Sequence, residues 1–282
     1  MRYNIEIFLL VLLFPGYLVT AHESSDLQAE AEAGDVHAQA DLADMHYDVQ
    51  YFELAAFWYT KAAEQGHATS QFKLAEMYRQ GEGVRPDYNK AAYWYTKAAE
   101  QGYKDAQYNL GIMYDNGIGV IQDDKQAAYW YLKAAEQGYA GAQYNLAVLY
   151  RKGKGVSQDE KQAIHWYTKA AGQGYPDAQL NLGLLYYYGS GLAKDDKQAV
   201  YWFAKAAGQG NAMAQYSLGL MYRNGLGVTQ DNVQAYEWLH IAAENGYKDA
   251  EKNRDSAAKD MSTEQISAAQ GLAREWLEKQ KK

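Results

Sequence analysis

Residues 103–138 read YKDAQYNLGIMYDNGIGVIQDDKQAAYWYLKAAEQG, and their pattern predicts two consecutive helices. Apolar residues recur at intervals of three and four from Ala106 onward, which predicts a helix. Gly117 and Gly119 end that helix, because glycine adopts the left-handed conformation of a helix C-cap at little cost. One aspartate of the pair Asp123–Asp124 then caps a second helix, which Gly138 ends. The stretch is therefore an αα-hairpin.

The hairpin recurs along the chain with a fixed period of 36 residues, marked by tryptophans and by glycines that close a KAAEQG-like string. The positions are Trp58, Trp94, Trp130, Trp166, Trp202 and Trp238, and Gly66, Gly102, Gly138, Gly174, Gly210 and Gly246. Equal gaps without an insertion are not an accident of composition. Such a period is typical of repeat proteins, in which each unit buries its apolar face by stacking on its neighbours.

One face of the first helix is assigned to the core by its spacing. The residues on that arc in the quoted unit are Ala106, Leu110, Met113 and Tyr114. Gly111 and the alanines of the second helix are expected to keep the two backbones close. Trp130 and its equivalents are expected to fill the space between hairpins.

The two ends of the repeat array depart from the pattern, as the ends of a solenoid should. We expect an N-terminal helical cap at 22–34, about six repeats at 35–246 and capping helices at 247–282. The first repeat is shortened, because Gly34 precedes Gly66 by 32 residues and the Gly-x-Gly loop is missing.

The final helix is predicted to open at Ser262, which forms a capping box with Gln265. Its predicted apolar side carries Ile266, Leu272, Trp276 and Leu277. The basic residues at its end complement the helix dipole.

Residues 1–21 are predicted to be a secretory signal peptide that is cleaved after Ala21. Arg2 precedes an apolar run from Ile7 to Phe14, which is shorter than the roughly 20 residues needed to span a bilayer. A buried N-terminal helix is the alternative, but Pro15–Gly16 would break it. We therefore expect a periplasmic or secreted protein with no membrane span after cleavage.

Charge and composition exclude several classes of function. The net charge is −8, with 27 basic and 35 acidic residues, whereas a nucleic-acid binder needs a basic field. The absence of cysteine excludes a disulfide framework, a thiolate metal site and a cysteine nucleophile. The six histidines form no H-E-x-x-H motif, and no nucleophile elbow or Walker loop is present. Paired carboxylates such as Asp159–Glu160 precede the second helices, where capping explains them.

The repeated signature A-x-x-x-L-G-x-x-Y, G-x-G-V and A-x-x-W-x-x-K-A-A-E-Q-G resembles the Sel-one-like repeat (SLR) family, a relative of the tetratricopeptide repeat. The resemblance covers about residues 35–246, and the C-terminal segment is similar to the ends of bacterial SLR proteins. It implies an all-α fold, a right-handed α/α superhelical solenoid that acts as an adaptor. Secreted bacterial members are linked with host interaction and envelope signalling. Cysteine-rich relatives have been associated with binding or weak hydrolysis of penicillins, but their disulfides are missing here, so that activity does not carry over.

The first helix of each hairpin lines the concave side in such superhelices, which places a candidate groove on the face opposite the core. The first row along this face is Phe72, Tyr108, Tyr144, Leu180 and Tyr216; the second is Glu76, Ile112, Val148, Leu184 and Leu220; the third is Arg79, Asp115, Arg151, Tyr187 and Arg223. Aromatic residues and arginine are enriched at binding hot spots. The alternative is that these side chains pack between hairpins, the second row above all.

The asparagines Asn109, Asn145 and Asn181 recur beside the first row. They could bond to an extended peptide backbone or to a neighbouring helix. The leading hypothesis is a non-catalytic, monomeric adaptor without metal or cofactor that binds a protein or peptide. The alternatives are a β-lactam or cell-wall hydrolase, and a peptidoglycan- or glycan-binding protein that uses the tyrosines as stacking platforms.

Overall fold

The computed structural model of the chain describes residues 21–280, and within them all regular structure is α-helical. The chain divides into two compact units, residues 1–122 and 123–282, which are described separately. Apart from Ala21, the predicted signal peptide lies outside the described residues.

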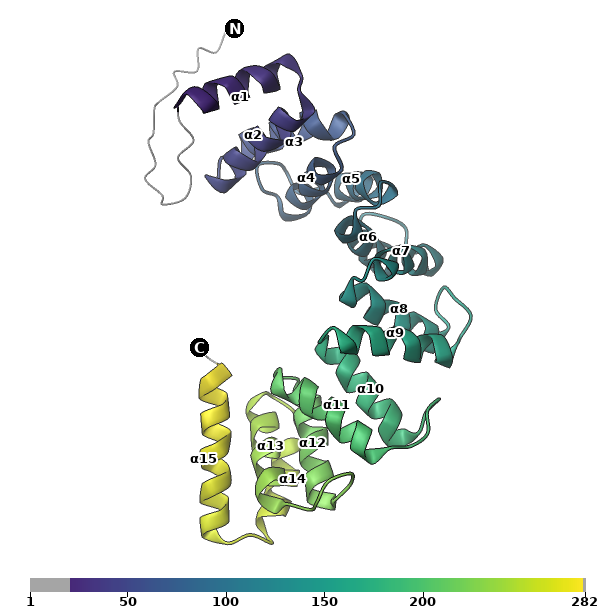
Figure 1. The fold of residues 1–282 in the computed structure, drawn as a ribbon, viewed down its shortest axis with the longest axis vertical. Helices are drawn as coiled ribbons and strands as arrows, with labels where there is room; N and C mark the ends of the chain where they lie inside the picture. The colour runs from purple at the N-terminus through teal and green to yellow at the C-terminus, as the bar shows by residue number, and fades with distance from the viewer. Residues whose placement is uncertain (1–20, 281–282) are drawn as a thin grey trace. The chain divides into compact units, whose positions relative to one another are not determined.

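Within residues 21–122, the first unit contains six helices, each in contact with the next (Figure 1). They are α1 (Ala21–Ala33), α2 (Val36–Asp48), α3 (Phe52–Glu64), α4 (Ala68–Gln80), α5 (Tyr88–Glu100) and α6 (Lys104–Asn116).

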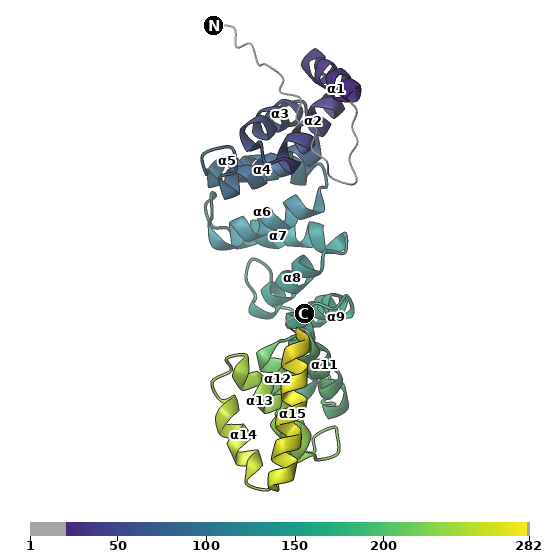
Figure 2. The same cartoon turned by 90° about the vertical axis from the view of Figure 1, so that its left-hand side faces the viewer.

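The second unit contains nine helices within residues 123–280. They are α7 (Asp124–Glu136), α8 (Ala140–Lys152), α9 (Glu160–Gly172), α10 (Pro176–Tyr188), α11 (Asp196–Gly208), α12 (Ala212–Asn224), α13 (Asn232–Glu244), α14 (Ala250–Ala258) and α15 (Thr263–Gln280). Helices α7 to α13 each contact the next helix along the chain, and α15 packs against α13 (Figures 1 and 2). None of the helices in residues 21–280 is long and apolar enough to span a membrane.

The aspartate that caps the second helix is Asp123, not Asp124. Its carboxylate accepts from the backbone N–H groups of Lys125 at 2.9 Å and Gln126 at 3.1 Å. These are amides that a helix start otherwise leaves without partners. The equivalent N-caps are Asp87, Asp159, Asp195 and Asp231. The interpretation of the paired carboxylates as capping residues is confirmed.

The Gly-x-Gly loop ends the first helix, as predicted. Its second glycine also packs closely against the preceding repeat. Gly153 has φ 66°, in the left-handed region that favours glycine. Gly155 lies so close to the first turn of α7 that an added Cβ would be 2.0 Å from the carbonyl oxygen of Asp124. Gly227 approaches Asp196 in the same way, at 2.2 Å. The second glycine therefore permits contact between repeats, a role that its spacing did not reveal.

The residue that follows each tryptophan, rather than the tryptophan itself, fills the centre of the core. Tyr95 and Tyr167 are fully buried, whereas Trp94 is half-buried at the edge of a core cluster. Phe203 faces Gly183, where an added Cβ would lie 2.7 Å from its ring. The prediction that small residues keep the two helices close is confirmed.

Within each unit, pairs of side-chain amides join neighbouring hairpins. Gln71, at the start of α4, is buried and donates to the carbonyl of Ala63 on α3 at 3.0 Å. Gln101, at the end of α5, donates to the Gln71 side-chain oxygen at 2.7 Å and to the carbonyl of Gly66 at 2.9 Å. The same contacts recur within the units at Gln39 with Gln65, Gln143 with Gln173, Gln179 with Gln209 and Gln215 with Asn245.

The C-terminal capping box is confirmed, but part of the predicted apolar side is not. The Ser262 N–H donates to Gln265 at 2.8 Å, and the Gln265 N–H donates to the Ser262 hydroxyl at 3.3 Å. Leu272 is 39% exposed, so its placement on the packed side was wrong. Ala269 and Ala273 are buried instead, because small side chains let a helix approach its neighbour closely.

We predict that Gly183→Val destabilises the protein by about 1–3 kcal/mol, because the new side chain overlaps the buried Phe203 ring. The matched control is Gly172→Val, at a helical glycine whose added Cβ meets nothing within 4 Å. Urea unfolding of both variants, followed by circular dichroism, measures the difference. Equal effects of the two substitutions would contradict this account of the close approach.

Candidate functional site

The aromatic residues of the first row are half-buried against a second aromatic residue from the start of the next repeat. Ring centroids are 4.9 Å apart for Phe72 and Tyr103, and 4.5 Å apart for Tyr216 and Tyr247. Tyr144 lies 5.2 Å from Tyr175 in the same arrangement. The first row is thus part of the contact between repeats and also partly exposed. Leu180, predicted in this row, is buried in the core, where the large side chain of Phe203 and its neighbours cover it.

The arginines of the third row differ in what they already bind. Arg79 pairs with Glu76 on its own helix at 2.5 Å. Arg223 is half-buried and donates to Asn253 at 3.3 Å and to Ser256 at 2.7 Å. Arg151 is exposed and donates to the Asn181 side-chain oxygen at 3.1 Å.

The other predicted groove residues are half-buried on two helices. Tyr108 and Asp115 lie on α6, the last helix of the first unit, and Tyr187 lies on α10 of the second unit. The Tyr187 ring packs edge-on against Tyr188 at 4.9 Å, with the ammonium of Lys194 at 5.7 Å.

Asparagines beside the first row bond between helices rather than standing free for a peptide backbone. Asn109 on α6 donates to Glu76 on α4 at 3.1 Å, and Asn181 on α10 accepts from Arg151 on α8. The sequence left open whether these asparagines bond to a bound peptide or to a neighbouring helix, and Asn109 and Asn181 bond to a neighbouring helix.

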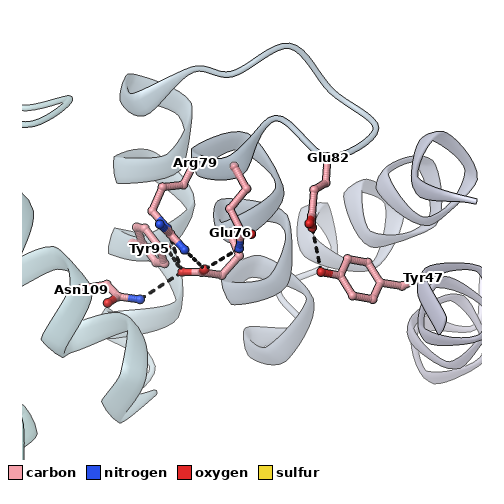
Figure 3. Close-up of polar contacts among 7 residues, drawn as sticks. Tyr47, Glu76, Arg79, Glu82, Tyr95 and Asn109 are labelled. Atoms are coloured by element: carbon pink, nitrogen blue, oxygen red, sulfur yellow. Dashed lines mark hydrogen bonds and ion pairs between the residues drawn. The ribbon is translucent and has the colours of Figure 1, made fainter. Parts of the chain in front are cut away.

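Glu76 is the centre of a polar cluster in the first unit (Figure 3). Its carboxylate accepts from Arg79 at 2.5 Å, from Asn109 at 3.1 Å and from the hydroxyl of the buried Tyr95. Burial alone would raise the pKa of Glu76. Hydrogen bonds from Arg79 and Tyr95 and the charge of Arg79 outweigh burial and hold the pKa below its ordinary value.

The first repeat satisfies its buried tyrosine in a similar way. The Tyr59 hydroxyl donates to Asp44 at 2.5 Å, and Lys73 pairs with the same carboxylate at 2.7 Å. Burial, and then the bond to Asp44, raise the pKa of Tyr59. Beside it, Tyr47 donates to Glu82 at 2.7 Å (Figure 3).

The fourth repeat has the tyrosine but no such carboxylate. Val148 stands where the second repeat has Glu76. The Tyr167 hydroxyl is buried without a hydrogen-bond partner, and burial raises the pKa of Tyr167 to about 12. The Tyr144 ring lies 5.9 Å from the Tyr167 ring, and the Arg151 guanidinium lies 5.8 Å from it. Tyr167 was not among the predicted groove residues, because it follows Trp166 on the second helix and does not lie on the predicted face of the first.

Residues 21–280 contain no group of three or more histidine, aspartate or glutamate side chains that could hold a metal ion. The predicted groove residues on the first helices offer hydrogen-bond donors, aromatic rings and positive charge.

We predict that Glu76→Gln lowers the free energy of unfolding by about 1–3 kcal/mol at pH 7, because charged hydrogen bonds are lost. Since the folded-state pKa of Glu76 is lowered, its stabilisation is fully present above about pH 4.3 and is lost as the pH falls through the folded-state value. The difference between variant and wild type should therefore shrink on acidification. Urea unfolding between pH 7 and pH 3 measures it, with Glu64→Gln at an exposed position as the control. A difference that does not change with pH would contradict the role of the Glu76 charge.

Comparison with known proteins agrees with this architecture. The Sel1 repeat family matches residues 36–67, 68–103, 104–139, 140–175, 176–211 and 212–247. A crystal structure of a protective antigen present in uropathogenic Escherichia coli strains, which displays an SLR fold, is 38% identical with a TM-score of 0.79. The match covers 91% of this chain and 56% of that one, so the chain spans little more than half of that protein.

A crystal structure of a Sel1 repeat protein from Oxalobacter formigenes is 32% identical, with a TM-score of 0.70. That match covers 85% of this chain and 95% of the other. No curated protein sequence shows significant similarity to the chain. Proteins built from these repeats are generally protein-interaction scaffolds. With six matched repeats and the resemblance in its motifs confirmed, the chain belongs to the Sel1-repeat family.

Proposed function

We propose that the protein is a non-catalytic scaffold that binds a segment of a protein partner on its second unit. The binding surface is the α8–α10 face, which consists of Tyr144, Val148 and Arg151 on α8 and Asn181 and Leu184 on α10. Membership of a family of interaction scaffolds supports the class of function. The observation that carries the location is the exposed Arg151 beside half-buried aromatic and aliphatic side chains.

The α8–α10 face combines the two properties of a peptide-binding hot spot. Tyr144, Val148 and Leu184 are half-buried, so a partner side chain that covers them removes further apolar surface from water. Arg151 is exposed and can form charge-assisted hydrogen bonds with an acidic partner. The equivalent arginine of the first unit, Arg79, is already paired with Glu76, so it is less available to an acidic partner.

The location outside the cytoplasm belongs to the same proposal. The predicted signal peptide supports a periplasmic or secreted protein, acting in envelope signalling or at the host interface. The similar E. coli structure is of a protective antigen.

We predict that Tyr144→Ala combined with Arg151→Glu weakens partner binding at least about tenfold, because the variant loses an aromatic contact and reverses a charge. A partner is first captured from envelope extract and host secretions with the wild-type chain, and is then purified. Its affinity for each variant is measured by isothermal titration calorimetry.

The matched control is Tyr129→Ala combined with Lys133→Glu. It makes the same kinds of change at an exposed Tyr–Lys pair on α7, where the ammonium lies 5.7 Å from the ring. The control should bind like wild type. Equal affinity of all three chains, or no partner for the wild type from either source, would refute the proposed function.

A further inference from the structure

The six repeats show a rule for the buried aromatic position of the second helix. In the first and second repeats this residue is a tyrosine, and its hydroxyl donates to an acidic residue of the first helix, Asp44 or Glu76. In the fifth and sixth repeats it is Phe203 or Leu239, with no hydroxyl to satisfy. A buried hydroxyl without a partner costs free energy, so a hydroxyl and an acceptor are expected to occur or vanish together.

The third repeat follows the same pattern in its sequence, and the fourth breaks it. Tyr131 of the third repeat is accompanied by Asp115, at the position that Arg79 has in the second. The fourth repeat has Tyr167 with Val148 and Arg151 at the two first-helix positions, so neither is acidic. Tyr167 is accordingly the buried tyrosine whose hydroxyl lacks a partner in the described second unit.

The fourth repeat nonetheless keeps the donors that hold a carboxylate in the second. Arg79, Tyr95 and Asn109, which bind Glu76, correspond two periods later to Arg151, Tyr167 and Asn181. Gln80, which donates to Glu76 at 3.1 Å, corresponds to Lys152, and this adds a positive charge.

The carboxylate acceptor is missing from this set, and Asn181 meanwhile donates to the backbone carbonyl of Asp177 on its own helix at 2.7 Å. Valine ends at its γ carbons, so Val148 does not supply the carboxyl group that Glu76 places among its donors. Asp177, one turn before Asn181, does not replace it, because its carboxylate accepts from Asn211 at 3.0 Å and the Tyr167 hydroxyl stays unpaired.

We propose that Arg151, Tyr167 and Asn181 form a binding site for the side-chain carboxylate of a glutamate in an extended peptide of the partner. The glutamate would occupy the position that Glu76 fills from within the chain, with Tyr144 and Leu184 against its flanking apolar residues. Arg151 would turn from Asn181 toward the carboxylate, as Arg79 does toward Glu76. The inference rests on the proposed scaffold function and names the chemistry of its partner.

The experiment uses three peptides as probes: acetyl-Leu-Glu-Leu-amide, acetyl-Leu-Gln-Leu-amide and acetyl-Leu-Gln-Leu with a free carboxyl terminus. NMR of the full chain labelled at the tyrosine Cζ reports on Tyr167, whose signal is identified with Tyr167→Phe. The glutamate peptide should shift this signal saturably, and both glutamine peptides should bind at least about tenfold more weakly, because they lack the side-chain charge. Tighter binding of the free carboxyl terminus would overturn the assignment to a side chain.

Two reciprocal substitutions test the site itself. Val148→Glu supplies the internal carboxylate, so it should weaken binding of the glutamate peptide at least about tenfold. Val148→Leu introduces a side chain close in size to glutamate but without an acceptor, so it should leave this binding unchanged. Glu76→Val frees the donors of the second repeat and should create a second site, reported by the Tyr95 signal. No saturable shift of Tyr167 in the wild type, or unchanged binding by Val148→Glu, would overturn the proposal.

The outcomes separate this site from the scaffold function. A captured partner that binds Val148→Glu as tightly as wild type would leave the scaffold standing and refute the carboxylate site. Loss of all partner capture would refute the scaffold, while the peptide measurements would still decide the site.

Discussion

The amide pair between hairpins, a buried glutamine such as Gln71 bonded to an exposed one such as Gln101, is the interaction on which the repeat architecture depends. A hairpin of this kind has too little apolar surface to fold by itself, so its stability comes from the next hairpin. Gln71 satisfies a carbonyl at the end of the preceding repeat, and Gln101 bonds to Gln71 and to the connecting loop. A buried amide or carbonyl without its partner would cost about 1–3 kcal/mol, so this pair fixes how each hairpin meets its neighbour.

With the contact between repeats fixed in this way, the exposed side of the first helix is free to vary. The arginines of the third row show this variation. Arg79 of the second repeat is neutralised by Glu76, Arg151 of the fourth repeat is exposed, and Arg223 of the sixth repeat donates to Asn253. The second row varies between an acidic residue and an aliphatic one. One skeleton thus presents a different combination of charge and apolar surface in each repeat, which is how repeat proteins acquire specificity.

The regular features of the fold followed from the sequence because each has a local cause. Helix ends at Gly117 and caps at Asp123 are set by backbone conformation and nearby amides. Features set by contacts between repeats did not follow. The face of a helix can be read from its periodicity, but the depth of burial along it cannot, so the sequence does not show that Tyr95 lies deeper than Trp94. Arg79 and Arg151 looked equivalent, because the residues that distinguish them, Glu76 and Val148, act through side-chain geometry that spacing does not show.

On the proposal made here, the fourth repeat binds from a partner the carboxylate that the second repeat carries within itself. A crystal structure of the chain with acetyl-Leu-Glu-Leu-amide bound tests this most directly. We expect the peptide carboxylate within hydrogen-bonding distance of the Tyr167 hydroxyl and the Arg151 guanidinium, in the arrangement that Glu76 has with Tyr95 and Arg79. A peptide bound elsewhere, or a Tyr167 hydroxyl paired with another group of the chain, would contradict it.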